Sequence, residues 1–273
     1  MPDKTLGVIG AGNMGSAIVQ GVLKAQLCQP HDIVVSDLER QKAENLAEKL
    51  GVEIAARAPE AARAASIILL AVKPQNMNEC LSEIESVVGT QQLVLSIAAG
   101  ITTRFIEDRL RKGARVVRVM PNTPALVGAG ATAICPGAHA THQDLQEAER
   151  IFSAVGKVYR LDESLMDAVT AVSGSGPAYL FLFAECLENA AVGCGLPERE
   201  AADLVAQTLF GASKLLIESG EQPSSLRARV TSPGGTTEAA VATLNRGGFG
   251  ELITEAVQNA LNRAQELGGD KKR

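Results

Sequence analysis

The sequence lacks the features that would place a protein of 273 residues in a membrane, outside the cell or on a nucleic acid. No apolar run approaches the about 18–20 residues that a membrane-spanning helix needs, and the longest one, residues 66–72, has the length of a strand. The N-terminus has no basic region followed by a long apolar core, so we expect no secretory signal. With 26 basic and 31 acidic residues, the net charge of −5 predicts no partnership with nucleic acid or with an anionic membrane.

Cysteine and histidine are too scattered to predict a disulfide framework or a metal centre. The five cysteines are odd in number, and none belongs to a C-x-x-C pair. This usage is typical of free thiols in a reducing compartment, so we expect a cytoplasmic protein. The three histidines lie near no cysteine or carboxylate cluster with the spacing of metal ligands, and we predict no metal site.

The chain does have a glycine-rich turn close to its start. The apolar run of residues 6–9 leads into Gly10-x-Gly12-x-x-Gly15, and a helical pattern of apolar residues follows. Strand, glycine turn and helix in this order are typical of a dinucleotide-binding site. Gly10 permits the tight turn, Gly12 lets the backbone approach a pyrophosphate, and Gly15 lets the helix pack on the strand. The helix N-terminus adds N–H groups for the phosphates. The residues that we predict to bind cofactor here are Gly10, Ala11, Gly12, Asn13, Met14 and Gly15.

Strand and helix patterns alternate as far as residue 161, and only helical patterns follow. The expected strands lie at residues 6–9, 33–36, 52–54, 67–72, 93–97, 116–120, 132–135 and 157–159. The later helices are expected at residues 163–172, 176–193, 197–219, 223–230, 236–246 and 249–268. We therefore predict an α/β protein with a Rossmann-type doubly wound parallel sheet in residues 1–161 and an all-helical domain in residues 162–273. Several of these helices are apolar on more than one face, which predicts a homodimer through this domain.

The expected carboxyl ends of the strands carry the rest of the predicted cofactor site. An acid near the end of the second strand binds the ribose hydroxyls of NAD, whereas an arginine and small polar groups accommodate the 2′-phosphate of NADP. Asp37 favours NADH, and Ser36 with Arg40 favours NADPH, so the residues leave both open. Our prediction is NADPH, with NADH also used. The loops after the fourth, fifth and sixth strands add the predicted cofactor residues Ala71, Val72, Lys73, Pro74, Ala98, Ala99, Gly100 and Asn122.

Two segments of the helical domain, residues 173–179 and 230–238, are rich in glycine and hydroxyl groups and end at an expected helix start. Converging backbone N–H groups at such turns suit a substrate carboxylate. The alternative is ordinary N-capping by serine or threonine. Two such segments beside a dinucleotide domain favour a substrate site, with contacts at Ser175, Gly234 and Gly235.

Five motifs, in this order and spacing, resemble those of the pyrroline-5-carboxylate reductase family. They are Gly10-x-Gly12-x-Met14-Gly15, Ala71-Val72-Lys73-Pro74, Met120-Pro121-Asn122-Thr123-Pro124, Ser173-Gly174-Ser175-Gly176-Pro177-Ala178-Tyr179 and Ser232-Pro233-Gly234-Gly235-Thr236-Thr237. The resemblance covers nearly the whole chain, and its last motif is highly specific. It implies NAD(P)H-dependent reduction of 1-pyrroline-5-carboxylate to L-proline, the last step of proline biosynthesis. It also implies a helical dimer that can assemble further into a decamer, and substrate contacts at Glu163, Thr236 and Thr237. Asp37 departs from the members that carry a neutral residue there.

Two other functions remain as alternatives. A β-hydroxyacid dehydrogenase shares the two-domain plan, but it uses a lysine on a second-domain helix, and residues 163–213 contain no lysine. A dinucleotide-binding redox sensor would not need two anion-binding turns. For the reductase we predict that backbone N–H groups from Gly234 to Thr237 bind the substrate carboxylate. The Thr237 hydroxyl, the predicted catalytic group, would hydrogen-bond the ring nitrogen of an imine that binds already protonated.

Overall fold

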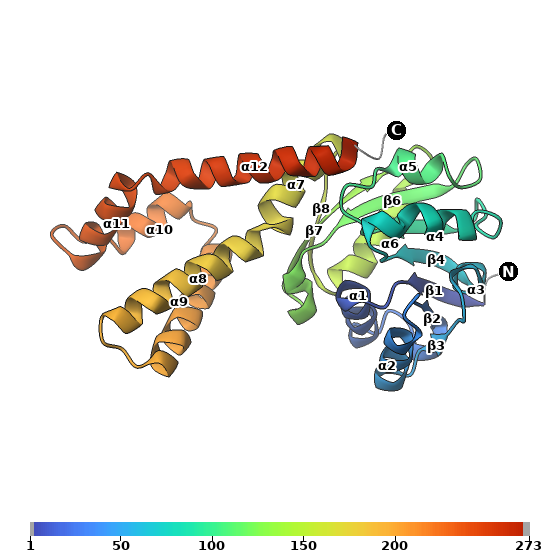
Figure 1. Ribbon diagram of the computed structural model, residues 1–273, viewed down its shortest axis with the longest axis horizontal. Coiled ribbons are helices and arrows are strands. Elements are labelled where there is room, and N and C mark those ends of the chain that lie inside the picture. Colours follow the sequence, from blue (N-terminus) through green and yellow to red (C-terminus); the bar gives the residue numbers. More distant parts are fainter. Residues whose placement is uncertain (1–2, 270–273) are drawn as a thin grey trace. The chain divides into compact units, whose positions relative to one another are not determined.

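The structure is a computed structural model that describes residues 3–269, and contacts divide these residues into two units. The sheet unit comprises residues 3–175 and 260–269, and the helical unit comprises Gly176–Asn259 (Figure 1). Helix α12 (Phe249–Gly269) is continuous across the second boundary. The predicted division after residue 161 falls earlier in the chain than the contact boundary, and it stays a prediction.

Eight strands form one sheet in the order β3-β2-β1-β4-β5-β6-β7-β8 (Figure 1). Their bounds are β1 Lys4–Ile9, β2 Ile33–Ser36, β3 Glu53–Ile54, β4 Ala65–Leu70, β5 Leu93–Ser96, β6 Arg115–Met120, β7 Gly130–Pro136 and β8 Gly156–Arg160. All eight predicted strands are therefore present. The order reverses between β1 and β4, which is the switch point of a doubly wound sheet and the place where such sheets bind ligands.

One strand pair departs from the predicted parallel sheet. Strands β3, β2, β1, β4, β5 and β6 pair in parallel, but β7 runs antiparallel to β6 and β8 runs parallel to β7. Only residues 121–129 separate β6 from β7, and a parallel crossover needs about a dozen residues or more. The 3₁₀ turn η3 (Thr123–Val127) ends at Gly128, whose φ is 75°, and the chain reverses there.

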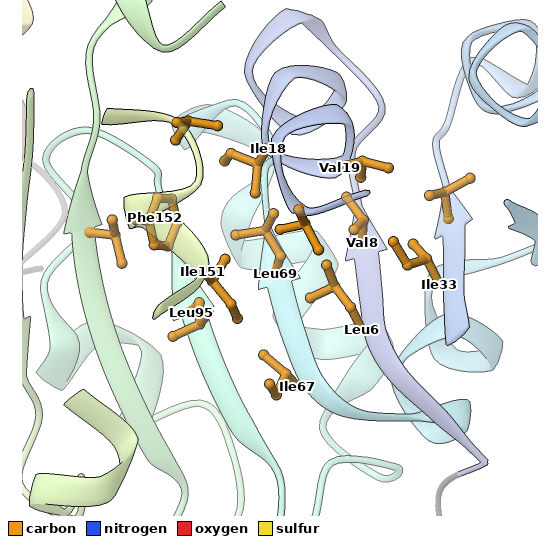
Figure 2. Packing of buried hydrophobic residues seen from close by; sticks show 14 of the residues in the cluster. Leu6, Val8, Ile18, Val19, Ile33, Ile67, Leu69, Leu95, Ile151 and Phe152 are labelled. Carbon is orange, nitrogen blue, oxygen red and sulfur yellow. The ribbon is translucent and has the colours of Figure 1, made fainter. Parts of the chain in front are cut away.

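Helices cover both faces of the sheet because neighbouring strand residues point to opposite faces. Leu69 belongs to the core on one face, and Ile68 and Leu70 belong to the core on the other. Figure 2 shows Ile18 and Phe152 packed in the first of these cores. The helices of that face are α1 (Asn13–Lys24), α2 (Arg40–Leu50) and α6 (His142–Ser153), and those of the other face are α3 (Ala58–Ala64), α4 (Met77–Ile84) and α5 (Thr103–Glu107).

The chain after β8 is helical, as predicted. In the sheet unit it forms η4 (Glu163–Leu165), α7 (Met166–Val169) and the π-helical turn η5 (Thr170–Gly174). The helical unit contains α8 (Gly176–Gly193), α9 (Glu198–Ser219), α10 (Pro223–Arg229), α11 (Thr236–Arg246) and the first part of α12. Large apolar side chains of this unit lie exposed, with Phe181 at 68% and Ile217 at 63%. Among the residues described, no helix has the length and apolar character needed to cross a membrane.

Candidate functional site

The three glycines of the first turn play different parts in the structure. Gly10 has a φ of 108° and donates its N–H to the Ser36 carbonyl at 2.8 Å, which closes the turn on β2. A Cβ on Gly15 would overlap the Gly10 carbonyl oxygen, so α1 can approach the turn only with glycine there. A Cβ on Gly12 would meet no described atom within 4 Å. Gly10 and Gly15 are thus needed by the fold, whereas Gly12 leaves space beside the turn.

A cavity of ≈ 340 Å³ lies beside this turn, at the carboxyl ends of β1, β2 and β4. This edge of a doubly wound sheet is where dinucleotides bind. The predicted cofactor residues that line it are Gly10, Gly12, Ser36, Asp37, Arg40, Ala71, Val72 and Lys73. The predicted cofactor residues that do not line it are Ala11, Asn13, Met14, Gly15, Pro74, Ala98, Ala99, Gly100 and Asn122.

Asp37 and Ser36 occupy the end of β2 in different ways. One Asp37 carboxylate oxygen accepts the Ala11 N–H at 2.7 Å, and the other accepts the Glu39 N–H at 2.8 Å. The Ser36 hydroxyl is only 2% exposed and has no hydrogen-bond partner among the described residues. A buried hydroxyl without a partner is costly, and Ser36 is one of the residues that line the cavity. The free space at Gly12 and the spare hydroxyl of Ser36 fit a dinucleotide.

Basic and acidic side chains both line the same cavity. Arg40 pairs with Glu44 at 2.7 Å, and Lys42 pairs with Glu39 at 2.6 Å. The hydrogen bond between Lys42 and Glu39 lowers the pKa of Glu39 and raises the pKa of Lys42. Arg57, 3.7 Å from a carboxylate oxygen of Glu83, lines the cavity too. Sequence reasoning missed Arg57, although it follows the expected third strand as Asp37 follows the second.

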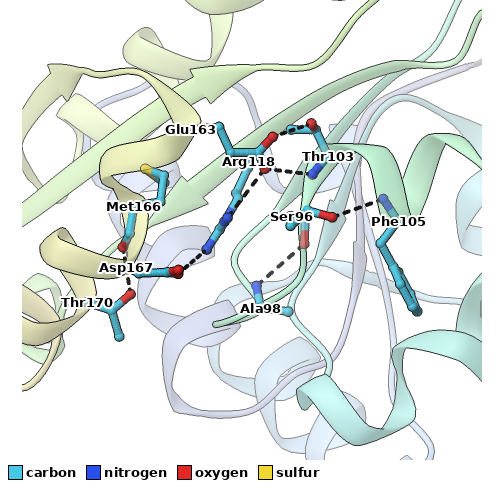
Figure 3. Close-up of polar contacts among 10 residues, drawn as sticks. Ser96, Ala98, Thr103, Phe105, Arg118, Glu163, Met166, Asp167 and Thr170 are labelled. Atoms are coloured by element: carbon cyan, nitrogen blue, oxygen red, sulfur yellow. Dashed lines mark hydrogen bonds and ion pairs between the residues drawn. The ribbon is translucent and has the colours of Figure 1, made fainter. Parts of the chain in front are cut away.

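The Glu163 side chain contacts Thr103, the first residue of α5. One of its carboxylate oxygens accepts the Thr103 N–H at 2.8 Å, and the other accepts the Thr103 hydroxyl at 2.7 Å (Figure 3). The Arg118 guanidinium lies 3.3 Å from the first oxygen. Thr103 begins the helix that follows the Ala98–Gly100 loop, so Glu163 binds the chain just after that loop. Its role as a substrate ligand stays a prediction.

Asn122 and Ser175 are both engaged with the chain itself. The Asn122 amide donates to the Ser173 carbonyl at 3.1 Å and accepts the Ala131 N–H at 2.8 Å. The Ser175 N–H donates to the Thr170 carbonyl at 2.8 Å, which closes the turn η5. The structure thus brings the loop after β6 next to the predicted substrate segment at residues 173–175.

The second predicted substrate segment forms the N-terminus of α11, with Gly235 as its N-cap and Thr236 and Thr237 in the first turn. Gly234 has a φ of 72°, and its N–H donates to a carboxylate oxygen of Glu238 at 2.7 Å. A carboxylate therefore already occupies one of the N–H groups that we predicted for a substrate. This is the behaviour expected of an electropositive helix start.

Cysteine and metal chemistry play no visible part at these sites. Within residues 3–269 no group of three or more His, Cys, Asp or Glu side chains is placed to hold a metal ion. Cys80 lines the cavity, but burial raises the pKa of its thiol to about 12. Burial likewise raises the pKa of Cys135 to about 12. Both are thiols at neutral pH, and neither is an activated nucleophile.

Known proteins resemble this chain along almost its whole length. A family model described as pyrroline-5-carboxylate reductase dimerisation matches residues 163–267, and one described as NADP oxidoreductase coenzyme F420-dependent matches residues 5–100. A pyrroline-5-carboxylate reductase of Methanosarcina acetivorans is 43% identical over 268 residues, which cover 98% of this chain and 99% of that protein. The structure of a pyrroline-5-carboxylate reductase from Coxiella burnetii matches with a TM-score of 0.91 and 38% identity, covering 97% of this chain and 98% of that one. That of Plasmodium falciparum pyrroline carboxylate reductase with NADP bound matches with a TM-score of 0.86 and 30% identity, covering 98% and 99%.

Proposed function

This chain belongs to the pyrroline-5-carboxylate reductase family, and we propose how its own residues carry out the reaction of that family. The protein is an NAD(P)H-dependent oxidoreductase that reduces 1-pyrroline-5-carboxylate to L-proline, the final step of proline biosynthesis. The observation that most supports the residue assignments is the open space at Gly12, beside a cavity that the predicted cofactor residues line.

The glycine turn and its cavity hold the dinucleotide, which supplies the hydride when bound. Gly12 and the N–H groups that begin α1 take the pyrophosphate. The buried Ser36 hydroxyl and the guanidinium of Arg40 take the 2′-phosphate of NADPH, joined by Arg57. Both oxygens of Asp37 already accept backbone N–H groups, which supports NADPH as the preferred cofactor with NADH also used. The loops that take the rest of the cofactor are Ala71–Pro74, Ala98–Gly100 and Asn122.

The N-terminus of α11 holds the substrate carboxylate. We assign the carboxylate to the N–H groups of Gly234–Thr237, at the positive end of the helix dipole; of these, the Gly235 N–H also donates to the Ser232 carbonyl at 3.0 Å. Glu238 supports this assignment, because its carboxylate accepts the Gly234 N–H at 2.7 Å, which shows that this N–H can bind a carboxylate. Substrate binding displaces Glu238 from that N–H. Ser175 completes the assigned substrate contacts.

Thr237 is the assigned catalytic residue. Its hydroxyl accepts the N–H of the protonated ring nitrogen and so orients the imine. The rate then depends mainly on placing the imine carbon ~3–3.5 Å from the donor. Neither substrate segment contains a histidine, so no imidazole acid is assigned. Glu163 stays among the assigned substrate contacts, and its carboxylate also binds Thr103 and Arg118.

The protein forms an oligomer through its helical unit. The dimerisation model covers residues 163–267, and the exposed apolar side chains of α8 and α9 are of the kind that a second copy buries. We assign a homodimer, with a decamer as its further assembly. The cytoplasm is the assigned location, because the five cysteines are free thiols, as a reducing compartment favours.

A turnover assay tests this function directly. Purified protein is mixed with 1-pyrroline-5-carboxylate, and the oxidation of NADPH and of NADH is followed in parallel by absorbance. We expect turnover with both. Thr237→Ala should lower kcat/KM more than tenfold, equivalent to about 1.4 kcal/mol of transition-state stabilisation, and Thr237→Ser should keep most of it. An unchanged kcat/KM in Thr237→Ala would remove Thr237 from the mechanism.

A further inference from the structure

A buried ion-pair cluster joins Arg118, which neither cofactor nor substrate is assigned to touch, to Glu163 and Asp167. The Arg118 side chain, on β6, is only 4% exposed. Its guanidinium lies 3.3 Å from a carboxylate oxygen of Glu163 and 3.4 Å from one of Asp167 (Figure 3). A buried guanidinium needs such partners, because an unpaired buried charge is strongly destabilising. Here the Arg118 guanidinium pairs with two carboxylates, Glu163 of η4 and Asp167 of α7.

The cluster reaches the predicted cofactor loop through Glu163. Thr103 gives both its N–H and its hydroxyl to Glu163, and it is the first residue of α5. Thr102, the N-cap of α5, follows the Ala98–Gly100 loop after a single residue. The carboxylate that Arg118 holds therefore sets the position at which that loop leaves the sheet edge.

The same end of β6 also holds the predicted substrate segment. Asp167 of α7 forms an ion pair with Arg118. The Asn122 side-chain amide donates a hydrogen bond to the Ser173 carbonyl at 3.1 Å. A Cβ on Gly174 would lie 2.7 Å from the terminal methyl of Met120, so η5 also packs closely there. Residues 163–174 are thus tied near their start, middle and end. They finish in a π-helical turn, a form that is frequent at functional sites.

We propose that Arg118 is a positioning residue for hydride transfer. It binds the Glu163 and Asp167 carboxylates at the same time. It thereby fixes the position of the Ala98–Gly100 loop relative to the Ser173–Ser175 turn. Arginine is required because its planar fork can serve both carboxylates at once, whereas lysine presents a single ammonium group. The inference rests on the proposed function, since it assigns these two segments to cofactor and substrate.

The test compares Arg118→Lys with Arg115→Lys in the full-length enzyme. Arg115 lies on the same strand and also pairs with a carboxylate, Asp144, at 2.8 Å, but it is at the opposite end of β6. We expect kcat to fall tenfold or more in Arg118→Lys, since a ~1 Å misplacement can cost about 10²-fold. The dissociation constant of NADPH should change less than about threefold, a free-energy change of roughly 0.7 kcal/mol. Arg115→Lys should keep its kcat.

A kinetic isotope effect separates positioning from general loss of structure. With NADPH deuterated at the transferred hydrogen, the isotope effect on kcat should rise in Arg118→Lys, because hydride transfer becomes the slow step. Partial unfolding would lower kcat without raising the isotope effect. An equal kcat in the two lysine variants, or a loss confined to NADPH affinity, would overturn the proposal. Wild-type turnover is measured first, so failure of the proposed function is seen separately.

Two milder variants keep the test open if Arg118→Lys does not fold. Thr103→Val removes one hydrogen bond to Glu163 and keeps the shape of the side chain, and Asp167→Asn removes one charge. Each should lower kcat by a smaller factor than Arg118→Lys does. In a double-mutant cycle, the effects of Thr103→Val and Asp167→Asn should be non-additive, because Glu163, the partner of Thr103, and Asp167 both bind Arg118. Full activity in both single variants would overturn the proposal.

Discussion

Gly12→Ala separates the demands of the cofactor from those of the fold. The backbone at Gly12 has φ −70° and ψ −176°, which alanine adopts without strain. A methyl group there would meet no described atom within 4 Å. In the proposed complex, however, the same space belongs to the pyrophosphate. The substitution should therefore leave the folded enzyme intact and weaken the binding of dinucleotide.

The expected effects on stability and on binding differ in size. Alanine restricts the unfolded chain and stabilises by about 0.4–1 kcal/mol. It is also a poorer N-cap than glycine, which costs a similar amount, about 1 kcal/mol. The free energy of unfolding should thus change little. An extra methyl group in a packed contact costs about 1–3 kcal/mol, so the dissociation constant of NADPH should rise about 5- to 150-fold.

Two further glycines give matched controls for this measurement. Gly89→Ala places its methyl 3.9 Å from Gln92, away from the residues that line the cavity, and should raise stability by about 0.4–1 kcal/mol without changing the affinity for NADPH. Gly15→Ala overlaps the Gly10 carbonyl and should lower both stability and affinity. Thermal unfolding and NADPH titration by calorimetry measure the two properties. Unchanged NADPH affinity in folded Gly12→Ala would refute the placement of the pyrophosphate.

The remaining predictions concern cofactor choice, substrate binding and the buried thiols. Asp37→Asn keeps an acceptor for the Ala11 N–H but removes a negative charge beside the 2′ position, so the ratio of kcat/KM for NADPH over NADH should rise about tenfold; steady-state kinetics with an unchanged ratio would contradict this. Glu238→Gln weakens the contact that competes for the Gly234 N–H, so KM for 1-pyrroline-5-carboxylate should fall about 2- to 10-fold with kcat retained, and a higher KM would show that Glu238 supports binding. Burial raises the pKa of Cys80 and Cys135 from 9.0 to about 12, so their contribution to stability is complete below pH 9.0 and is lost as the pH rises toward 12. Mass spectrometry after iodoacetamide treatment at pH 8 should find both unmodified in the folded protein and alkylated after unfolding.

Much of the architecture could be predicted because its causes are local. The glycine turn needs specific residues at specific positions, and the buried strands show as short apolar runs. Proline, glycine and apolar spacing likewise marked α8 at residues 176–193, where the structure has it. These signals depend on neighbours only a few residues apart. Five motifs in order were enough to indicate the family.

Pairings between distant segments could not be predicted in the same way. Connection length could have indicated that β7 runs antiparallel, but the alternating pattern favoured a uniform parallel sheet. Arg118 carried one signal, a charge within the apolar strand Val116–Met120, yet a charge alone does not name its partner. Glu163 was predicted as a substrate contact, which stays a prediction, and its attachment to Thr103, 60 residues away in the sequence, gave no signal.

The amino-acid sequence alone was therefore enough to predict the elements, the glycine turn, the family and the reaction. It could do so because secondary structure and motif chemistry depend on residue spacing along the chain. The contacts between distant side chains became known from the folded structure: the Asp37 carboxylate on the Ala11 N–H, Arg57 at the cavity, and Arg118 between two carboxylates. Those contacts form because folding buries a charge or a polar group that must then find a partner, and the nearest partner in space lies far away in sequence.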